Sequence, residues 1–239
     1  ARGERPSRCL IAASASAKMC VAESLLNLAA SDVEALEKIK VSANWMSAAN
    51  YTGEGSKLYE AVRAIGIELC PDLGISIPVG KDSLSMKMNW KDQKTGESKE
   101  VIGPLSLVIT SFAPVADTGK TWTPQLQNKE GTKLVLVDLS ATQEKKSLGG
   151  SAFLQVYNKL GNSAPTVYSH SVLKSFLEAV IALHQKDIVL AYHDRSDGGL
   201  VVTLLEMAFA GRAGLDIEIN SGKETAFEAL LNEELGAVF

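Results

Sequence analysis

The sequence predicts an α/β fold with mixed sheets, organised in two units. Segments with apolar residues at helical spacing alternate along the chain with short apolar runs and alternating patterns typical of strands. A stretch rich in turn-forming residues, 114–131, interrupts this pattern near the middle of the chain. The chain has 239 residues and is 46% hydrophobic, which is enough for a sizeable core. We therefore expect a globular protein with one unit on each side of the interruption.

Charge and cysteine content exclude several classes of function. The formal net charge is −4 and the lysines and arginines are scattered, so no basic surface for nucleic acid or for a membrane is expected. The three cysteines show no pairing or metal-ligand spacing, which fits a reducing, cytoplasmic compartment. No signal-peptide core and no apolar stretch long enough to span a bilayer is present in the sequence.

Both ends of the chain predict that it is part of a longer protein. The first residue is not methionine and lies in a charged turn, and residues 236–239 have the pattern of a strand that is just beginning. We expect a fragment.

The first unit is expected to begin with a helix and a short strand. Residues 16–30 carry one apolar face at helical spacing, with Ser14 or Ser16 as the capping residue. Residues 38–43 have the pattern of a short strand, followed by a loop at 44–45.

A second helix and a hairpin should follow. Helical spacing extends over residues 54–70, and Pro71 is expected to end this helix. An extended segment at 74–80 comes next. The alternating residues 83–90 and the apolar run 101–113 predict a hairpin, and the charged stretch between them predicts a solvated loop.

The second unit is predicted to mix strands and helices as well. Its strands are expected at 133–139, around Ile188 and around Leu215, and its helices at 149–160, 173–184 and 200–210.

The segment 188–200 carries the strongest chemical signal. A buried strand is predicted to run into an acidic turn with Asp194, Ser196 and Asp197, after which a helix begins. A carboxylate at the end of a strand can hold a divalent cation, and the free N–H groups that begin a helix can receive a phosphate oxygen. Gly198 and Gly199 would let the backbone approach such a ligand. The alternative is a simple turn with a helix cap.

Glu23 and Asn27 are a second group of candidate ligands. They are four residues apart on the first predicted helix, so their side chains project from one face and offer a carboxylate and an amide oxygen to one cation. Hard oxygen ligands of this kind suit magnesium. The alternative is an ordinary solvated helix face.

Lys81, Asp82 and Ser83 form a third group, placed directly after an extended segment. The amine of Lys81 could meet a phosphate as a point charge. The spacing from earlier glycines is wrong for a P-loop, and a turn leading into the hairpin is an equally good interpretation.

The histidines are not spaced as metal ligands, and no arrangement typical of a hydrolase stands out. His193, beside Asp194, would either orient a ligand or pack in the interior.

Beyond these patterns, the chain resembles the phosphoribosylformylglycinamidine synthase family over its whole length. The resemblance is carried by nine motifs in order: Gly3-Glu-Arg-Pro6, Val21-Ala-Glu-Ser-Leu-Leu-Asn-Leu28, Ser42-Ala-Asn-Trp-Met46, Gly53-Glu-Gly55, Pro78-Val-Gly-Lys-Asp-Ser-Leu-Ser-Met86, Pro104-Leu-Ser-Leu107, Thr123-Pro-Gln-Leu126, His193-Asp-Arg-Ser-Asp-Gly-Gly199 and Asn232-Glu-Glu-Leu-Gly236.

The resemblance implies an ATP-dependent C–N ligase of purine biosynthesis. In the family the amide oxygen of formylglycinamide ribonucleotide is phosphorylated, and ammonia then displaces phosphate to give the amidine. The ammonia comes from glutamine through a separate glutaminase domain, which would be a partner from the rest of the parent chain. No nucleophile-elbow cysteine with its histidine is present in these 239 residues, so we expect that this piece cannot make ammonia from glutamine. We also expect it to be inactive by itself, because the synthase activity would require parts of the parent chain that are missing here.

The resemblance also implies a fold and a domain division. The family's synthase region has two related halves, each with domains like those of aminoimidazole ribonucleotide synthetase, and this chain resembles part of the second half. Residues 1–116 would be the latter part of an N-terminal domain, 117–132 a linker, and 133–239 the beginning of a C-terminal domain.

Site residues follow from the same resemblance. Glu23, Asn27 and Asp194 match family positions that hold Mg²⁺, and Ser196 matches a position that touches the nucleotide, ATP or ADP. Lys81, Asp82 and Ser83 match a motif that could line the site. The cluster belongs either to the catalytic centre or to an auxiliary nucleotide site with a structural role, so a non-catalytic nucleotide-binding module is the alternative function. Relatives that phosphorylate other small substrates, such as selenophosphate synthetase, are a third alternative, although the motifs around Asn44 and Lys81 differ from theirs.

Overall fold

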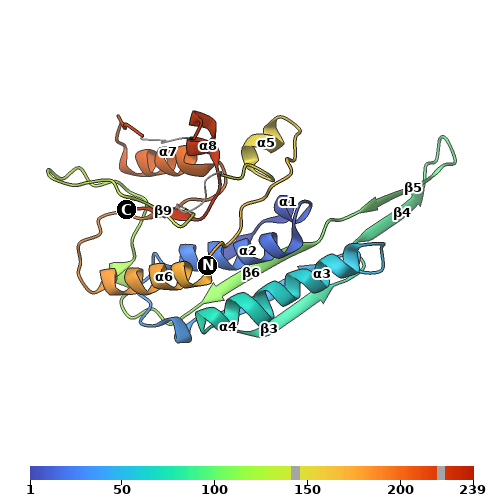
Figure 1. Cartoon of the computed structure of the whole chain (residues 1–239), viewed down its shortest axis with the longest axis horizontal. Coiled ribbons are helices and arrows are strands. Elements are labelled where there is room, and N and C mark those ends of the chain that lie inside the picture. The colour runs from blue at the N-terminus through green and yellow to red at the C-terminus, as the bar shows by residue number, and fades with distance from the viewer. Residues whose placement is uncertain (141–145, 220–223) are drawn as a thin grey trace.

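The computed structural model describes residues 1–140, 146–219 and 224–239, and it has the expected mixture of helices and strands (Figure 1). The α-helices are α1 (Pro6–Cys9), α2 (Ala13–Leu28), α3 (Glu54–Arg63), α4 (Cys70–Leu73), α5 (Ala152–Val156), α6 (His170–His184), α7 (Gly199–Gly211) and α8 (Ala226–Leu231). The strands are β1 (Arg2–Glu4), β2 (Lys40–Met46), β3 (Ser76–Ser83), β4 (Lys87–Lys91), β5 (Ser98–Ile102), β6 (Ser106–Phe112), β7 (Leu136–Asp138), β8 (His193–Asp194) and β9 (Gly236–Val238). Short 3₁₀ turns occur at Leu36–Lys38 and Thr118–Lys120.

The largest sheet has four strands in the order β1-β6-β2-β3. Strand β6 pairs antiparallel with β1 and β2, whereas β2 and β3 are parallel, with Asn44 opposite Lys81. The predicted strand at 38–43 is therefore confirmed and longer than expected, because the proposed loop at 44–45 continues it. Strand β1 was not predicted, since three residues between charged neighbours give no alternating pattern.

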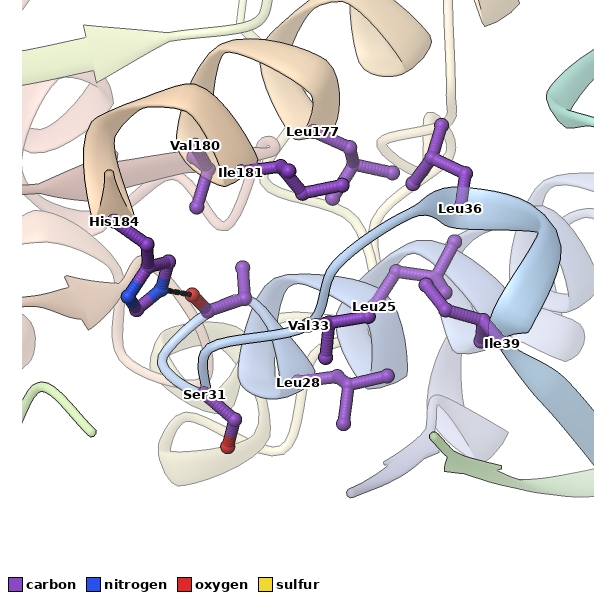
Figure 2. Close-up of a pocket in the computed structure, with 11 residues that line it drawn as sticks. Leu25, Leu28, Ser31, Val33, Leu36, Ile39, Leu177, Val180, Ile181 and His184 are labelled. Carbon is purple, nitrogen blue, oxygen red and sulfur yellow. Dashed lines mark hydrogen bonds between the residues drawn. The ribbon is translucent and has the colours of Figure 1, made fainter. Parts of the chain in front are cut away.

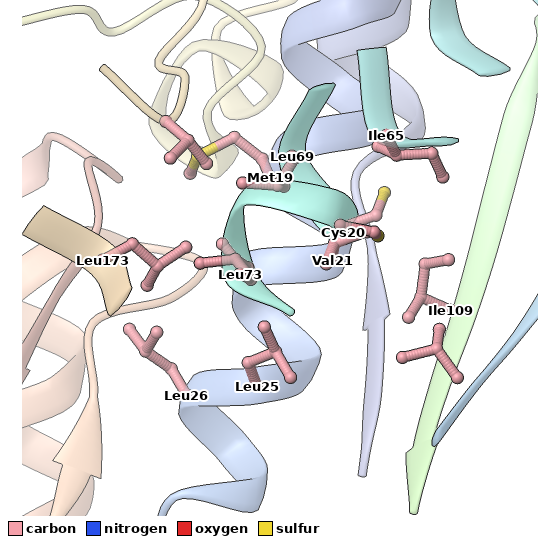
Figure 3. Packing of buried hydrophobic residues seen from close by; sticks show 14 of the residues in the cluster. Met19, Cys20, Val21, Leu25, Leu26, Ile65, Leu69, Leu73, Ile109 and Leu173 are labelled. Atoms are coloured by element: carbon pink, nitrogen blue, oxygen red, sulfur yellow. The ribbon is translucent and has the colours of Figure 1, made fainter. Parts of the chain in front are cut away.

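Helix α2 packs on β1 and β6 and is the centre of the core. Most of its residues are buried, on all sides of the helix. In Figure 3, Met19, Leu25 and Leu26 project from α2 among the side chains of the neighbouring elements. The predicted helix at 16–30 is confirmed, but the capping prediction is wrong: the helix starts at Ala13 with no side-chain cap, and the hydroxyl of Ser16 donates to the Arg5 carbonyl at 2.6 Å.

The second predicted helix is confirmed in part, and its predicted end is wrong. After α3 the chain continues through a π-helical stretch, Ala64–Leu69, into α4, which ends before Gly74. Pro71 lies in the first turn of α4. The N–H groups in the first turn of a helix have no hydrogen-bond partner within the helix. A proline at this position therefore costs no hydrogen bond, and the helical path continues through it. Gly74, with a φ of 75°, ends the helix instead.

The hairpin differs from its prediction. Strand β4 pairs with β5, with Met88 opposite Val101, and this two-stranded arm extends away from the rest of the molecule (Figure 1). The run 101–113 is split between β5 and β6 by Gly103 and Pro104, and only β6 joins the main sheet. Proline cannot donate a hydrogen bond to a ladder, which explains the break.

The remaining sheet has three short strands in the order β7-β9-β8, all antiparallel. It confirms a strand at 236–239 and only the middle of the one predicted at 133–139. Helix α6 matches its prediction closely, α7 begins one residue early, and α5 is much shorter than the predicted 149–160.

Two predicted strands of this region are wrong. Residues 188–192 and 213–219 form no strand with any part of the chain that the structure describes, and Ile188 is 64% exposed. An apolar run becomes a strand only where a neighbouring strand supplies hydrogen bonds, and here pairing begins at His193.

No helix among the described residues is long and apolar enough to cross a membrane. All three cysteines are free and buried, and burial raises the pKa of the Cys20 thiol to about 12.

Candidate nucleotide and metal site

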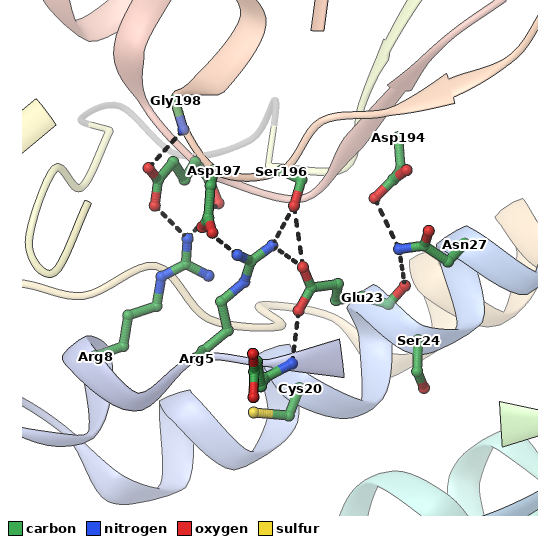
Figure 4. A network of polar contacts seen from close by, with 12 residues as sticks. Arg5, Arg8, Cys20, Glu23, Ser24, Asn27, Asp194, Ser196, Asp197 and Gly198 are labelled. Atoms are coloured by element: carbon green, nitrogen blue, oxygen red, sulfur yellow. Dashed lines mark hydrogen bonds and ion pairs between the residues drawn. The ribbon is translucent and has the colours of Figure 1, made fainter. Parts of the chain in front are cut away.

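The candidate residues of α2 and of the loop after β8 meet at one place (Figure 4). Glu23 and Asn27 face residues 194–197 from one side of α2, although Asn27 and Asp194 are 167 positions apart in the chain. They are polar exceptions on an otherwise largely buried, apolar helix. The fold therefore brings together four of the predicted residues: Glu23, Asn27, Asp194 and Ser196.

Glu23 lies at the centre of this arrangement. Its Oε1 accepts a hydrogen bond from the Ser196 hydroxyl at 3.0 Å and pairs with Nη2 of Arg5 at 2.5 Å. Its Oε2 accepts the backbone N–H of Glu4 at 2.9 Å. Burial raises the pKa of Glu23, and Arg5 offsets only part of this effect. The carboxylate is thus costly to keep charged without a cation beside it.

Arg5 supplies that cation, and sequence reasoning missed it. The residue is only 4% exposed, and its guanidinium contacts Glu23, the Ser196 hydroxyl at 2.7 Å and the carboxylate of Asp197. Asp197 itself is largely exposed. The motif Gly3-Glu-Arg-Pro6 carries the family resemblance, but no local spacing connects Arg5 with Glu23.

Asn27 and Asp194 form the other half of the site. Nδ2 of Asn27 donates to Oδ2 of Asp194 at 3.3 Å, and Asp194 is 7% exposed. Rotation of the amide by half a turn would present its oxygen, instead of its nitrogen, beside the carboxylate. In that orientation the pair would offer two oxygen ligands.

The donor atoms of Glu23, Asn27 and Asp194 are of the chemical type that binds magnesium. Two carboxylates and one amide oxygen are hard ligands of the type that Mg²⁺ takes in proteins. Within the described ranges, no group of three or more His, Cys, Asp or Glu side chains is positioned to hold a metal ion. Glu23 is also already paired with Arg5. A cation that used all three donors would therefore require Arg5 to release Glu23.

The glycine pair does not have the role expected of it. Gly198 and Gly199 adopt positive φ angles of 84° and 71°. A Cβ on Gly199 would lie 2.6 Å from the carbonyl oxygen of Asn232, and the N–H of Gly198 donates to Oε1 of Glu233 at 2.8 Å. The close approach is to the chain's own residues 230–233, so the first N–H groups of this turn are already satisfied.

A second arginine near the site, Arg8, forms an ion pair with Glu233. Nη2 of Arg8 pairs with Oε2 of Glu233 at 2.7 Å, and both side chains are almost fully buried. Burial lowers the pKa of Arg8, and Arg5 nearby acts in the same direction. The other carboxylate oxygen accepts the N–H groups of Ala152 and Gly198, so Glu233 has no ligand position left.

Arg195, between two predicted site residues, points away from the site. Its Nη2 pairs with Asp138 at 2.9 Å and its Nε donates to the Glu234 carbonyl at 2.6 Å. Burial alone would raise the pKa of Asp138, but Arg195 and the hydrogen bonds from Ser140 outweigh it and lower that pKa to about 2. These contacts fasten β7 to the loop after β8.

Lys81, Asp82 and Ser83 lie on β3, apart from this cluster. Lys81 and Asp82 are exposed, and Nζ of Lys81 donates to the Ser83 hydroxyl at 2.6 Å. No hydrogen bond or ion pair within the described part of the chain connects them with Glu23, Asn27 or Asp194.

His193 is held by carboxylates on both sides. Nε2 lies 2.8 Å from Glu206, and Nδ1 lies 3.6 Å from a carboxylate oxygen of Asp194. Burial lowers the pKa of His193, but the two acids together raise it above its ordinary value. Its Nδ1 also lies 2.8 Å from the backbone carbonyl oxygen of Asp194.

Two hollows lie outside the cluster. The smaller, of about 20 Å³, lies between α2 and α6 and is lined almost entirely by apolar side chains (Figure 2). His184 closes it with a hydrogen bond to the Ala29 carbonyl at 3.0 Å. The larger is an open groove of about 1510 Å³ between residues 126–139, 188–191 and 211–217, and it contains none of the predicted site residues.

Comparison with known families divides the chain in two. Residues 1–114 match the FGAR-AT PurM_N-like domain, and residues 129–239 match the C-terminal domain of AIR synthase related proteins.

Among curated proteins, the chain is 65% identical over its full length to phosphoribosylformylglycinamidine synthase of Saccharomyces cerevisiae. It is 51% identical, again over its full length, to the protein of the same name from Schizosaccharomyces pombe. The chain spans about 18% of the length of each of these relatives.

Solved structures show the same fold at low identity. Thermotoga maritima PurL complexed with FGAR matches 99% of this chain, and 36% of its own chain, with a TM-score of 0.67 and 12% identity. PurL complexed with ATP matches 99% of this chain, and 34% of its own, with a TM-score of 0.58 and 14% identity. The chain thus has a PurM-like α/β fold.

Proposed function

The chain belongs to the phosphoribosylformylglycinamidine synthase family, and from that premise we propose that it is a section of the synthase region that binds a nucleotide with Mg²⁺. The parent protein would convert formylglycinamide ribonucleotide to the amidine with ATP and with ammonia from glutamine. The glutaminase domain and the remainder of the synthase would be its partners, in the cytoplasm. Its curated relatives carry the name of this enzyme, and the PurL structures are titled as complexes with FGAR and with ATP.

The observation that carries the proposal is the convergence of Glu23, Asn27, Asp194 and Ser196. These residues come from distant segments, and hydrogen bonds connect Glu23 with Ser196 and Asn27 with Asp194. Buried carboxylates are unfavourable unless they are paired, so such a grouping at a loop is more typical of a ligand site than of a structural core.

Each residue would have a distinct task. Glu23, Asn27 and Asp194 would hold the cation through their oxygens, and Ser196 would donate to a phosphate oxygen of the nucleotide. The bound cation would neutralise negative charge on the phosphates. Lys81, Asp82 and Ser83 would line the nucleotide path from β3 only if a further part of the parent chain closes the distance. We propose residues 1–116 and 133–239 as the two domains, with 117–132 as the linker.

A second candidate is a structural nucleotide site without catalytic turnover. It is favoured by the ion pairs of Arg5 with Glu23 and Asp197, which join the N-terminal segment to the loop after β8. In this case the ligand would fasten the two domains together. For the chain by itself we favour this role, and for the parent protein we favour the enzyme.

Calorimetric titration of ADP and of ATP, with and without Mg²⁺, tests the site. We expect the wild-type chain to bind in a Mg²⁺-dependent manner and the Asp194→Asn variant to lose at least tenfold in affinity, because one charged ligand is removed. Asp216→Asn, at an exposed position, is the matched control. Unchanged binding by Asp194→Asn would refute the site. In the parent protein, lost turnover would indicate a catalytic site, whereas lost stability with normal turnover would indicate the structural one.

A further inference from the structure

Arg5 occupies the position beside Glu23 that a cation would need. Its guanidinium lies 2.5 Å from Oε1 of Glu23 and 2.7 Å from the Ser196 hydroxyl, in a nearly closed environment. Figure 4 shows this guanidinium between Glu23 and Asp197, with Asn27 further along α2 and Asp194 facing Asn27 from β8. The metal-binding end of the site therefore already contains a positive charge.

A guanidinium and a divalent cation cannot both remain on one buried carboxylate oxygen. Like charges at contact distance repel strongly where the local dielectric is low. Glu23 has its second oxygen committed to the N–H of Glu4, so Oε1 is the atom for which the two cations would compete.

Asp197 offers Arg5 an alternative partner. Nη1 contacts Asp197, whose side chain is 73% exposed and free to follow a moving partner. Nε of Arg5 has no hydrogen-bond partner in the part of the chain that the structure describes, so the pair with Glu23 does not use every donor. A shift of the guanidinium toward Asp197 would free Glu23 and keep Arg5 paired.

We propose that Arg5 is a positioning residue that occupies Glu23 in the absence of a divalent cation and moves to Asp197 when the cation binds. This inference rests on the proposed function, because it takes Glu23 to be a metal ligand. Arg5 keeps Glu23 charged and correctly placed, at the expense of weaker cation binding. It sets the cation concentration at which the site fills.

Electron paramagnetic resonance of free Mn²⁺, with Mn²⁺ alone as the probe, tests the proposal on the intact chain. Arg5→Gln removes the competing charge, so we expect Mn²⁺ to bind about tenfold more tightly. A merely structural arginine would give the opposite sign, since its loss would loosen the site. Arg5→Lys, which keeps the charge, should bind within about twofold of wild type, and Arg2→Gln, at an exposed ion pair on the same segment, is the matched control.

A second variant guards against poor folding of Arg5→Gln. Asp197→Asn removes the alternative partner, so Arg5 should stay on Glu23 and Mn²⁺ should bind about threefold more weakly. Circular dichroism of each variant confirms that it is folded. Weaker or unchanged binding by folded Arg5→Gln, or tighter binding by Asp197→Asn, would overturn the proposal.

Asp194→Asn separates this inference from the proposed function. If it leaves Mn²⁺ binding unchanged, the metal site itself is wrong and the inference about Arg5 is wrong with it. If it abolishes binding but Arg5→Gln does not tighten binding, the site is supported and only the role of Arg5 is refuted.

Discussion

Two arginines three residues apart, Arg5 and Arg8, each pair with a glutamate, and the two pairs have opposite characters. Arg8 and Glu233 are sealed: neither side chain reaches solvent, and both carboxylate oxygens are occupied. Arg5 and Glu23 are open on one side, through the exposed Asp197. The difference teaches that an ion pair indicates function by what surrounds it. A closed pair fastens segments together, whereas an open pair can exchange its partner for a ligand.

The largest expected effect is on the sealed pair. Glu233→Gln would leave Arg8 buried without a negative partner, and removal of one member of a buried pair costs about 3–5 kcal/mol of stability. Urea unfolding at pH 7 measures this loss. Glu97→Gln, on the exposed β4–β5 arm, is the control and should change the free energy of unfolding by less than about 0.5 kcal/mol. A loss below about 1 kcal/mol for Glu233→Gln would show that the pair is not a structural fastening.

The glycine of the sealed region should respond next most strongly. Gly199→Ala places a methyl group against the Asn232 carbonyl at a backbone angle that alanine disfavours, which should cost about 2–3 kcal/mol. Gly214→Ala, where a Cβ would meet nothing within 4 Å, should be close to neutral. If Gly199→Ala instead left stability unchanged and weakened only nucleotide binding, the glycine would face the ligand after all.

A smaller effect is expected for Asp138, and it should depend on pH. Its pKa is lowered from 3.8 to about 2 in the folded protein, so its stabilising contribution is present above pH 4 and is lost as the pH falls through about 2. Asp138→Asn should therefore cost roughly 2 kcal/mol at pH 7 and almost nothing near pH 2. Urea unfolding across this range, with wild type as the reference, would contradict the account if the difference were constant.

The smallest stability effect is expected at the open pair. Burial raises the pKa of Glu23, so its charge costs free energy, and Arg5 keeps Ser196 and Asp197 as partners when Glu23 is neutralised. Glu23→Gln should cost only about 1 kcal/mol, measured by urea unfolding. A loss as large as that of Glu233→Gln would remove the distinction between the two pairs.

Local patterns in the sequence predicted much of the fold and part of the site. Helical spacing placed α2 and with it the shared face of Glu23 and Asn27. The predicted turn before a helix placed Asp194 and Ser196 just ahead of α7, although the strand expected before that turn, 188–192, does not form. That these two groups meet depends on tertiary packing, and the expectation that they do came from the family resemblance. Arg5 was missed because its partners are distant in the chain. An ion pair between distant residues produces no periodic pattern in the sequence.

The errors have physical causes of the same kind. The run 188–192 is apolar enough for a buried strand, but no strand among the described residues pairs with it, and residues 188–191 line the open groove instead. Gly198 and Gly199 indicated a close approach of the backbone, which is correct, but the sequence could not say whether a ligand or Asn232 lies opposite.

The most direct test of the account is calorimetric titration of Mg²⁺ and ADP into Glu23→Gln and Glu233→Gln, at a temperature where circular dichroism shows both to be folded. The account predicts that Glu23→Gln, although the more stable variant, loses Mg²⁺-dependent binding, whereas Glu233→Gln keeps an affinity within about threefold of wild type. Normal binding by Glu23→Gln together with lost binding by Glu233→Gln would contradict it.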